Sequence, residues 1–355
     1  MKALIPAAGF GSRLRPLTFS RPKPVLPVAG QPIIVYALQH LRDVGLEDIA
    51  IVTSEATEAP LRAALADWPD VTFLRQAYMG GLGHAVASAE DWADGDDLCV
   101  MLADNLFEHS PAGLLQAFRD GGAQAALALV EVEDPRAFGV AELDGEGASG
   151  RVRSIVEKPE QPETNLAVAG LYCFTPRIFE ALRQVPVSAR GELELTDAIS
   201  WLIRDGAVVS GYRQPGWWKD TGRPADLLEA NAWMLARQGS VQRGTVEHSL
   251  VQGNVVIEAG ARVCRSVIVG PAYIGPDAVI EDARLGPGVS VGRGAQVIGA
   301  IVRHSILEAG ACVSGLSGTL SDSILGQGAQ LSRQPATSYH QCLMPDASTL
   351  SMAGD

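Results

Sequence analysis

The last third of the chain carries a short repeat that few folds can accommodate. From residue 257 onward an aliphatic residue recurs every five or six positions, often followed by Gly or Glu and then, after two variable residues, by Ala or Val. The five clearest copies are IEAGA from residue 257, IGPDA from 274, VGRGA from 291, LEAGA from 307 and LGQGA from 325. A hexapeptide repeat of this kind predicts a parallel β-helix, in which each short strand turns one aliphatic side chain inward and Gly fits the tight corners. With about 18 residues to a three-sided coil, residues 245–330 predict about five coils.

The residues before the repeat have a different texture, in which apolar runs alternate with helical patterns. Strands are expected at residues 3–6, 49–53, 72–74, 98–103, 125–132 and 166–174, a hairpin at 139–143 with 151–157, and helices at 32–46, 59–66, 83–93, 111–120, 176–182, 195–204 and 224–237. This β-α-β alternation predicts an α/β fold with a Rossmann-like, doubly wound and mostly parallel sheet.

The length of the chain agrees with two domains, since single hydrophobic cores rarely grow beyond about 250–300 residues. We place the boundary after Gln238-Gly239, where the texture changes. The prediction is an α/β domain at 1–239, a β-helix domain at 240–331 and a loosely attached tail at 332–355.

Charge and cysteine content exclude several classes of protein. The chain has 28 Lys and Arg residues and 41 Asp and Glu residues, a net charge of −13, which argues against broad binding of nucleic acid or an anionic membrane. No apolar run reaches the roughly 18–20 residues of a transmembrane helix. The five cysteines form no C-x-x-C pair and predict buried thiols in a reducing, cytoplasmic protein.

The first motif with chemistry is the loop after the first expected strand. Its sequence, PAAGFGSRLRP over residues 6–16, lets backbone N–H groups approach a phosphate closely. Leu14 excludes the dinucleotide fingerprint and Ser12-Arg13 excludes a P-loop, so a phosphate-binding turn and a purely structural turn both stay open. Only four basic residues are Lys, and one of them, Lys23, lies between prolines that are expected to hold it in an extended segment. Arg13 and Lys23 are candidates for a clamp on a charged leaving group.

Two carboxylates lie in motifs that suit a divalent cation. Asp104 follows the strand at 98–103, and the carboxyl ends of strands in open α/β sheets border the ligand crevice. Asp220 lies far away in the chain, within WWKDTGRP from residue 217. Mg²⁺ takes few protein ligands together with phosphate oxygens, so this pair fits it. Capping of a helix is the alternative role for Asp104.

Glu157-Lys158-Pro159 is the last motif and ends the strand at 151–157. There Glu157 can accept hydrogen bonds from sugar hydroxyls, while Lys158 binds the phosphate of the same sugar. An ordinary Glu-Lys pair on the protein surface is the alternative.

These motifs resemble the sugar-1-phosphate nucleotidyltransferases, also called nucleotide-sugar pyrophosphorylases. The family's loop of small residues, Gly-x-Gly-Thr/Ser-Arg and a later Lys-Pro, matches residues 7–13 and 23–24; its metal-bearing Ala-Asp-Asn matches 103–105, and its Glu-Lys-Pro matches 157–159. The stretch 216–231 and GLGHAV from residue 81 resemble the long, β-helix-bearing glucose-1-phosphate thymidylyltransferases. The likeness covers residues 1–330.

The resemblance implies a left-handed parallel β-helix of hexapeptide repeats behind the nucleotidyltransferase domain. It implies that the enzyme joins a nucleoside triphosphate, with dTTP favoured, to glucose 1-phosphate by Mg²⁺-assisted in-line attack on the α-phosphorus, giving dTDP-glucose and pyrophosphate. The implied contacts are Ala8, Gly9, Gly11, Ser12, Arg13, Gln76 and Gly81 for the nucleotide, Gly139, Glu157, Lys158 and Val168 for the sugar phosphate, and Asp104 and Asp220 for Mg²⁺. The implied catalytic residues are Arg13, Lys23, Asp104, Lys158 and Asp220. Flat faces of the β-helix further predict a homo-oligomer.

One departure from the family pattern leaves the nucleobase open. Ala7-Ala8 stands where thymidylyl enzymes usually have Gly-Gly, and Ala-Ala-Gly is more usual in uridylyl and some guanylyl relatives. A UTP-dependent enzyme that makes a UDP-sugar is therefore the first alternative, and another sugar-1-phosphate nucleotidyltransferase is the second. A non-catalytic regulatory subunit of the same fold is the alternative from another class, although such a subunit is expected to have lost a metal carboxylate or the loop arginine.

Overall fold

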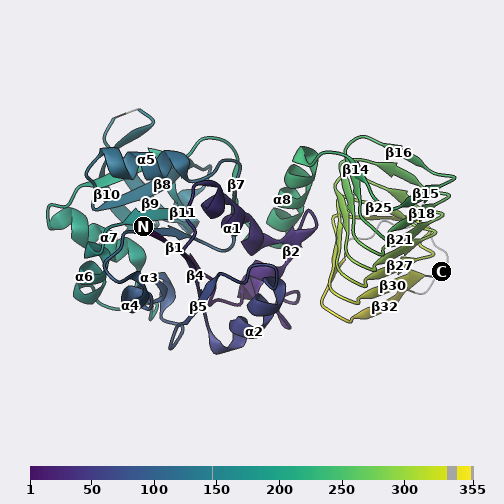
Figure 1. Cartoon of the computed structure of the whole chain (residues 1–355), viewed down its shortest axis with the longest axis horizontal. Coiled ribbons are helices and arrows are strands. Elements are labelled where there is room, and N and C mark those ends of the chain that lie inside the picture. Colours follow the sequence, from purple (N-terminus) through teal and green to yellow (C-terminus); the bar gives the residue numbers. More distant parts are fainter. Residues whose placement is uncertain (146, 334–341, 353–355) are drawn as a thin grey trace. The chain divides into compact units, whose positions relative to one another are not determined.

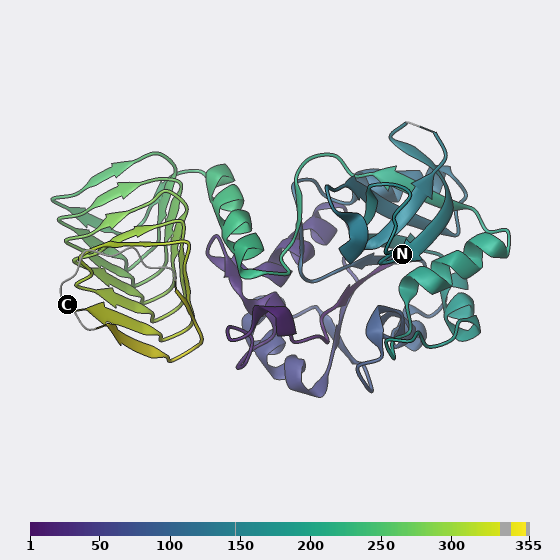
Figure 2. The ribbon, with the colours of Figure 1, turned by 180° about the vertical axis from the view of Figure 1, so that it is seen from behind.

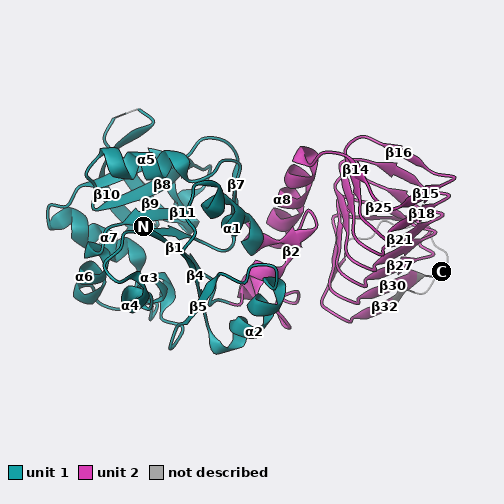
Figure 3. Ribbon diagram, in the orientation of Figure 1, with its two compact units in different colours: residues 1–9, 34–220 teal, residues 10–33, 221–355 magenta. Residues whose placement is uncertain are grey.

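The computed structural model describes residues 1–145, 147–333 and 342–352. The chain divides into two compact units, one made of residues 1–9 and 34–220 and the other of residues 10–33 and 221–355 (Figure 3). Each unit has its own hydrophobic core. Among the described residues no helix is both long and apolar enough to span a bilayer.

A nine-stranded mixed sheet forms the centre of the first unit (Figure 1). Across the sheet the strands are β5 (Thr72–Arg75), β4 (Ile49–Thr53), β1 (Lys2–Pro6), β6 (Leu98–Met101), β11 (Leu166–Phe174), β8 (Ala125–Glu131), β12 (Val209–Arg213), β10 (Ser149–Glu157) and β9 (Gly139–Leu143). β5, β4, β1 and β6 pair in parallel, each with its neighbour in this order. This confirms the α/β class and its parallel core. β9, β10 and β11 run antiparallel to their neighbours, where a mostly parallel sheet was predicted. The chain between β8 and β11 contains the β9–β10 hairpin in place of a crossover helix, so these strands can pair antiparallel.

Helices surround this sheet. They are α1 (Ile33–Asp43), α2 (Glu55–Ala64), α3 (Gly81–Ala87), α4 (Glu90–Ala93), α5 (Ala112–Asp120), α6 (Arg177–Gln184) and α7 (Leu195–Arg204). The core of the unit forms where α3, α6 and α7 bury Val86, Ile178 and Ile199 against the sheet. The helix predicted at 83–93 is divided into α3 and α4 at Ser88, whose hydroxyl donates to the carbonyl of His84 at 2.8 Å.

Two irregular features of the first unit shape the region beyond β6. The short strands β7 (Asn105–Phe107) and β13 (Trp218–Asp220) form a separate antiparallel ladder. β11 has a bulge between Val168 and Tyr172, where Gly170 has φ +70°. A Cβ on Gly170 would lie 2.8 Å from Cδ1 of Leu102, so only glycine lets β11 pass the β6–β7 turn this closely.

A three-sided parallel β-solenoid makes up most of the second unit (Figure 2). Its first sheet consists of β14 (Val241–Gln242), β17 (Val255–Ile257), β20 (Ala272–Ile274), β23 (Val289–Val291), β26 (Ile306–Leu307), β29 (Ile324–Leu325) and β31 (Leu343–Met344). The second consists of β15 (Thr245–Glu247), β18 (Arg262–Cys264), β21 (Val279–Glu281), β24 (Gln296–Ile298), β27 (Cys312–Ser314), β30 (Gln330–Arg333) and β32 (Thr349–Met352). The third consists of β16 (Leu250–Gln252), β19 (Val267–Val269), β22 (Arg284–Leu285), β25 (Ile301–Arg303) and β28 (Thr319–Ser321).

The repeat pattern places one aliphatic side chain of each copy inside the solenoid, as predicted. Ile257, Ile274, Val291, Leu307 and Leu325 align in neighbouring strands and are all buried. Burial of each such side chain contributes about 1.5–3 kcal/mol. The aligned positions lie 17, 17, 16 and 18 residues apart, and β15 to β30 span the five coils expected for residues 245–330.

The solenoid continues into the segment that was expected to form a loosely attached tail. β31 pairs with β29 and β32 with β30, in the register of the preceding coils. Met344 aligns with Leu325 and is buried, so a methionine takes the inward position that the repeat pattern gives to an aliphatic residue. The tail prediction is therefore wrong for residues 342–352, while 334–341 and 353–355 lie outside the described residues.

The second unit also contains the 10–33 segment and α8 (Pro224–Arg237). The segment forms the 3-10 turns η1 (Ser12–Leu14) and η2 (Lys23–Val25) and a small hairpin of β2 (Pro27–Val28) and β3 (Gln31–Pro32). α8 packs against β2, β20 and β23. The buried Asn231 of α8 accepts hydrogen bonds at Oδ1 from the N–H of Ala29 at 2.9 Å and the hydroxyl of Ser290 at 2.6 Å. The predicted domain boundary after Gly239 falls between α8 and β14.

The cysteines follow the prediction only in part. Cys99 and Cys173 are buried in the first unit, whereas Cys264, Cys312 and Cys342 of the solenoid are half-buried. All five are free thiols.

Candidate active site

Beyond β1 the backbone of the chain borders open space at Gly9. The N–H of Ala7 donates to the carbonyl of Val52 at 2.8 Å, and the hydroxyl of Ser54 donates to the carbonyl of Ala8 at 3.0 Å. Ala7 and Ala8 are buried, but Gly9 is exposed, and a Cβ on Gly9 would meet no atom within 4 Å. The arrangement fits a turn whose backbone N–H groups approach a phosphate.

Gly11 and Lys23 of the second unit lie in direct contact. Gly11 has φ +83°, and a Cβ there would lie 2.7 Å from the Cβ of Lys23. The N–H of Lys23 donates to the carbonyl of Phe10 at 3.0 Å, and Lys23 as a whole is only 6% exposed. Ser12 and Arg13 form the start of η1 and are exposed. The close packing of the Lys23 stem therefore requires glycine at position 11.

The extended conformation predicted around Lys23 is wrong from that residue onward. Pro22 is extended, with ψ 152°, but Lys23–Val25 form η2, which closes with a hydrogen bond from the N–H of Leu26 to the carbonyl of Lys23. The φ that Pro24 imposes is also the φ of a 3-10 turn, so the proline supports this turn instead of an extended chain.

Gln76 and Gly81, both assigned to the nucleobase by resemblance, share a hydrogen bond. Nε2 of Gln76 donates to the carbonyl of Gly81 at 3.2 Å and lies 2.8 Å from Nδ1 of His84. Because a carbonyl can only accept, this contact fixes which side of the amide carries nitrogen. No described residue donates a hydrogen bond to the amide oxygen of the buried Gln76.

Asp104 and Asp220 occupy neighbouring positions although they are far apart in the chain. In the β7–β13 ladder Asp220 lies opposite Asn105, the residue that follows Asp104. One carboxylate oxygen of Asp104 accepts a hydrogen bond from Nδ2 of Asn105 at 2.9 Å. Asp104 lies in the turn between β6 and β7, where no helix begins, so the capping role considered for it is wrong.

The indole of Trp218 holds this ladder against the bulge of β11. Its Nε1 donates to Oδ1 of Asn105 at 2.8 Å and to the carbonyl of Ala169 at 3.1 Å. The ring also packs edge-on against Phe138, with ring centroids 5.5 Å apart. One side chain thus connects β7, β13 and β11 with the start of the β9–β10 hairpin.

Gly139, Glu157 and Val168 meet at that hairpin. Gly139 pairs with Glu157 across β9 and β10. A Cβ on Gly139 would lie 2.9 Å from Cγ2 of Thr196, 3.4 Å from Oε2 of Glu157 and 3.7 Å from Cγ2 of Val168. Oε2 of Glu157 accepts a hydrogen bond from the hydroxyl of Thr196 at 3.2 Å. The structure thus brings these three predicted residues together and adds Thr196, which the sequence analysis missed.

Two cations lie at the other oxygen of Glu157. Nζ of Lys158 is 3.0 Å from Oε1, and Nη2 of Arg190 is 3.3 Å from it. Arg190 also pairs with Glu194 at 2.8 Å, and hydrogen bonding to Glu194 is the main cause of a raised pKa of Arg190. The sequence analysis missed Arg190. The available signal was RGELELTD from residue 190, a dense run of charges directly before a helix.

The negative charges of Glu157 and Asp104 both act on the hydroxyl of the buried Tyr172. Burial is the main cause of the raised pKa of Tyr172, and the negative charges of Glu157 and Asp104 raise it further. Glu157 ends β10 and Asp104 lies in the β6–β7 turn, yet both act on one hydroxyl. Within the first unit, the hairpin cluster and the Asp104–Asp220 pair therefore belong to one region.

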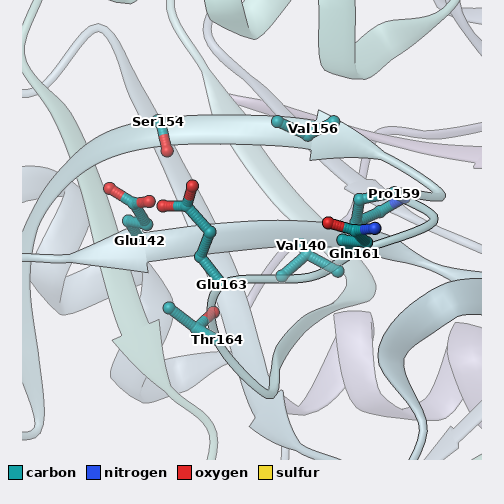
Figure 4. Close-up of a pocket in the computed structure, with 8 residues that line it drawn as sticks. All are labelled: Val140, Glu142, Ser154, Val156, Pro159, Gln161, Glu163 and Thr164. Atoms are coloured by element: carbon teal, nitrogen blue, oxygen red, sulfur yellow. The ribbon is translucent and has the colours of Figure 1, made fainter.

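A separate pocket of about 380 Å³ lies on the other face of the β9–β10 hairpin (Figure 4). Val140, Glu142, Ser154 and Val156 line it, in alternation with the residues that face Thr196 and the core. The carboxylates of Glu142 and Glu163 point toward each other there, and their hydrogen bond is the main cause of a raised pKa of Glu163. No predicted site residue lines this pocket.

Comparison with protein families decides the family. A model described as nucleotidyl transferase matches residues 2–237. The chain belongs to this family. A second model, described as GlmU-like, C-terminal hexapeptide, matches residues 225–300, in agreement with a left-handed β-helix of hexapeptide repeats.

Individual relatives narrow the activity to sugar 1-phosphates. Glucose-1-phosphate thymidylyltransferase of Streptomyces antibioticus is 39% identical over 355 residues, 98% of each chain. The UTP–glucose-1-phosphate uridylyltransferase AglF of Haloferax volcanii is 37% identical over 234 residues, 65% of this chain and 95% of that protein. The crystal structure of a UDP-glucose pyrophosphorylase complexed with UDP-glucose matches with a TM-score of 0.60 and 30% identity, over 66% of this chain and 99% of that one. The chain is a sugar-1-phosphate nucleotidyltransferase.

Proposed function

We propose that this nucleotidyltransferase joins dTTP to glucose 1-phosphate and releases pyrophosphate and dTDP-glucose. The register that puts Asp220 opposite Asn105, next to Asp104, is the observation that carries the proposal of metal-dependent nucleotidyl transfer. Similarity over 98% of both chains to a glucose-1-phosphate thymidylyltransferase supports dTTP and glucose 1-phosphate. UTP is the second candidate, supported by the similarity to AglF and by Ala7-Ala8 in the loop.

The triphosphate is bound by the backbone of Ala8, Gly9, Gly11 and Ser12 and by the side chain of Arg13. The open space beside Gly9 supports this role. Lys23 and Arg13 offset the negative charge of the departing pyrophosphate.

The base is bound at Gln76 and Gly81. The amide oxygen of Gln76, which no described residue uses, accepts a hydrogen bond from the N3–H of thymine or uracil. Cytosine carries no proton at N3, so this contact disfavours CTP.

The sugar phosphate lies against the β9–β10 hairpin. Glu157 accepts hydrogen bonds from hydroxyls of the sugar, and Gly139 and Val168 border the ring. Lys158 and Arg190, which both lie within 3.3 Å of Glu157, bind the phosphate.

Asp104 and Asp220 fit a Mg²⁺ site. Carboxylate oxygens are the donors that Mg²⁺ prefers, and both residues are half-exposed. The described part of the chain has no group of three or more His, Cys, Asp or Glu residues suited to a metal. Asp104 and Asp220 would hold Mg²⁺ together with phosphate oxygens of the substrate and water. When bound, Mg²⁺ neutralises charge on the triphosphate and orients it.

The reaction is a displacement at the α-phosphorus. An oxygen of the sugar phosphate forms the new bond to this phosphorus, the bond to the bridging oxygen of the β-phosphate breaks, and pyrophosphate leaves with the electron pair. An anionic nucleophile needs no general base, so the protein contributes alignment and charge neutralisation. Lys158 lowers the repulsion between the two anionic substrates.

Parallel assays of pyrophosphate release test the proposal. Each of dTTP, UTP, CTP, GTP and ATP is supplied with glucose 1-phosphate and Mg²⁺. We expect the highest kcat/KM with dTTP and the second highest with UTP. A higher kcat/KM with UTP than with dTTP would make UTP the proposed substrate. No release of pyrophosphate with any triphosphate would support a regulatory subunit instead.

A further inference from the structure

The first sheet of the solenoid has an outer face that is covered by other parts of its own unit. Its outward side chains Val256, Ser290, Ile306 and Ile324 are buried, whereas outward Val269 of the third sheet is 41% exposed. α8 covers part of this face through Asn231 and Ser290. The 10–33 segment covers another part, since a Cβ on Gly30 would lie 2.5 Å from the ring of Tyr273.

A second contact joins the 10–33 segment to two coils of the solenoid that have one further coil between them, since β29 lies between β26 and β31. The guanidinium of Arg21 forms ion pairs with Glu308, which follows β26, and with Asp346, which follows β31. The contact to Asp346 is 3.0 Å long, and Ser20 donates a hydrogen bond to the same carboxylate. The side chain of Arg21 is only 16% exposed. Its burial lowers the pKa of Arg21, and the charge of Asp346 opposes this shift.

Glu308 is not required by the repeat that contains it. The same position is glycine in three of the five repeat copies, at Gly275, Gly292 and Gly326. Glu308 nevertheless has a side chain only 2% exposed. A buried carboxylate is costly unless a cation is paired with it, and Arg21 is that cation.

Arg21 lies two residues before Lys23, and the residues between Phe10 and Lys23 close on themselves. The N–H of Lys23 bonds to Phe10, and the hydroxyl of Thr18 donates to the carbonyl of Gly11 at 2.8 Å. Through these bonds the position of Arg21 is coupled to the positions of Gly11 and Lys23.

We propose that Arg21, Glu308 and Asp346 are positioning residues for the nucleotide: through them the solenoid holds Gly11, Arg13 and Lys23 in the conformation that binds the triphosphate. This inference rests on the proposed function, which gives these three residues that task. It assigns the solenoid a part in binding the nucleotide and none in binding the sugar phosphate.

The variant Arg21→Met tests the proposal, with Arg265→Met as its matched control. Arg265 pairs with Glu281 and Asp282 and thus joins two neighbouring coils of the solenoid. We expect Arg21→Met to raise KM for dTTP about tenfold or more while KM for glucose 1-phosphate changes less than about twofold. The control should change neither value. Equal changes in both KM values, or no difference between Arg21→Met and the control, would overturn the proposal.

A double variant keeps the test valid if Arg21→Met leaves Glu308 unpaired and unfolds the protein. Arg21→Met with Glu308→Met removes the buried carboxylate of Glu308 together with its cation. Asp346 also loses Arg21, but its carboxylate is 19% exposed and keeps the hydrogen bonds from the hydroxyl of Ser20 and the N–H of Gln327. Hydrogen exchange then measures the loop directly. Amides of residues 10–23 should exchange faster than in wild type and in Arg265→Met, while those of β1, β4 and β6 in the first unit stay protected. Unchanged exchange at residues 10–23 would refute the positioning role, whether or not the wild-type protein is active. A wild-type protein without turnover would refute only the proposed function.

Discussion

At the scale of single residues, Asn105 controls the geometry of the Asp104–Asp220 pair. Its Nδ2 donates to Asp104, its Oδ1 accepts from Trp218, and its backbone lies opposite Asp220. An amide can do this because it has a donor and an acceptor at its two ends, whereas a carboxylate at this position would only accept. Asn105 therefore orients one metal carboxylate and fixes the strand that carries the other.

Removal of the negative charge from Asp104 or Asp220 should abolish most of the activity. Asp104→Asn and Asp220→Asn are each expected to lower kcat/KM by about two to four orders of magnitude, because a neutral amide binds Mg²⁺ poorly. Pyrophosphate release with dTTP and glucose 1-phosphate measures the loss, and circular dichroism checks the fold. Asp277→Asn is the control, since Asp277 pairs with Arg293 at the solenoid surface at 3.0 Å. Turnover equal to that control in either variant would refute the metal assignment.

Gln76→Glu tests the orientation of the amide. The new oxygen would face the carbonyl of Gly81, which now accepts a hydrogen bond from Nε2. We expect KM for dTTP to rise about tenfold or more and KM for glucose 1-phosphate to change less than about twofold. Gln296→Glu, at an exposed position of β24, serves as control. A parallel rise of both KM values would contradict a role confined to the base.

The sequence could predict site residues only where a motif surrounds them. Glu157 and Lys158 stand in a Glu-Lys-Pro motif at the end of a strand, and the structure brings Glu157 to Gly139 and Val168. Arg190 and Thr196 reach the same carboxylate from a different part of the chain. Thr196 lies in α7 and Arg190 lies shortly before it, so their positions depend on how α7 packs against β10. The run of charges from residue 190 does not predict that packing.

At the scale of elements, periodic segments were predictable and short irregular ones were not. The solenoid could be predicted because its repeat shows the same local pattern five times. The β7–β13 ladder consists of two three-residue strands whose partners are distant in sequence, so it has no periodic signal. The antiparallel half of the sheet likewise depends on long-range pairing of β8 with β11.

The β9–β10 hairpin offers a test at this scale, because its first residue must lack a side chain. In Gly139→Ala the added Cβ would lie 2.9 Å from Thr196 and 3.4 Å from Oε2 of Glu157, so the carboxylate or the helix must shift. We expect KM for glucose 1-phosphate to rise about tenfold and KM for dTTP to stay within about twofold. In the control Gly239→Ala the new Cβ meets nothing within 4 Å. An unchanged sugar-phosphate KM in Gly139→Ala would show that this space is not used by the substrate.

At the scale of the whole molecule, the order of residues along the chain differs from their grouping into units. The chain leaves the first unit after Gly9, returns to it at Ile34 and leaves it again after Asp220. The residues proposed for the sugar phosphate and the metal all lie in the first unit, whereas Gly11, Arg13 and Lys23 lie in the unit of the solenoid. A cut at the predicted boundary after Gly239 therefore separates the 10–33 segment from most of the residues of its own unit.

A chain that ends at Gln238 makes this consequence measurable. It keeps α8 and the 10–33 segment but loses Tyr273, Ser290, Glu308 and Asp346, which now contact them. We expect a lower Tm and a KM for dTTP at least about tenfold higher, with a smaller effect on KM for glucose 1-phosphate. The flat solenoid faces are expected to carry self-association, so their loss should also lower the size of the species seen by sedimentation velocity.

A chain that ends at Arg333 is the graded control for that truncation. It retains Glu308 as a partner of Arg21. Of the described residues it loses 342–352, which contain Asp346, β31 and β32. Its KM for dTTP should therefore lie between the values of the full chain and of the chain ending at Gln238. If both truncated chains bind dTTP as the full chain does, the 10–33 segment holds its conformation without the solenoid, and the solenoid serves self-association alone.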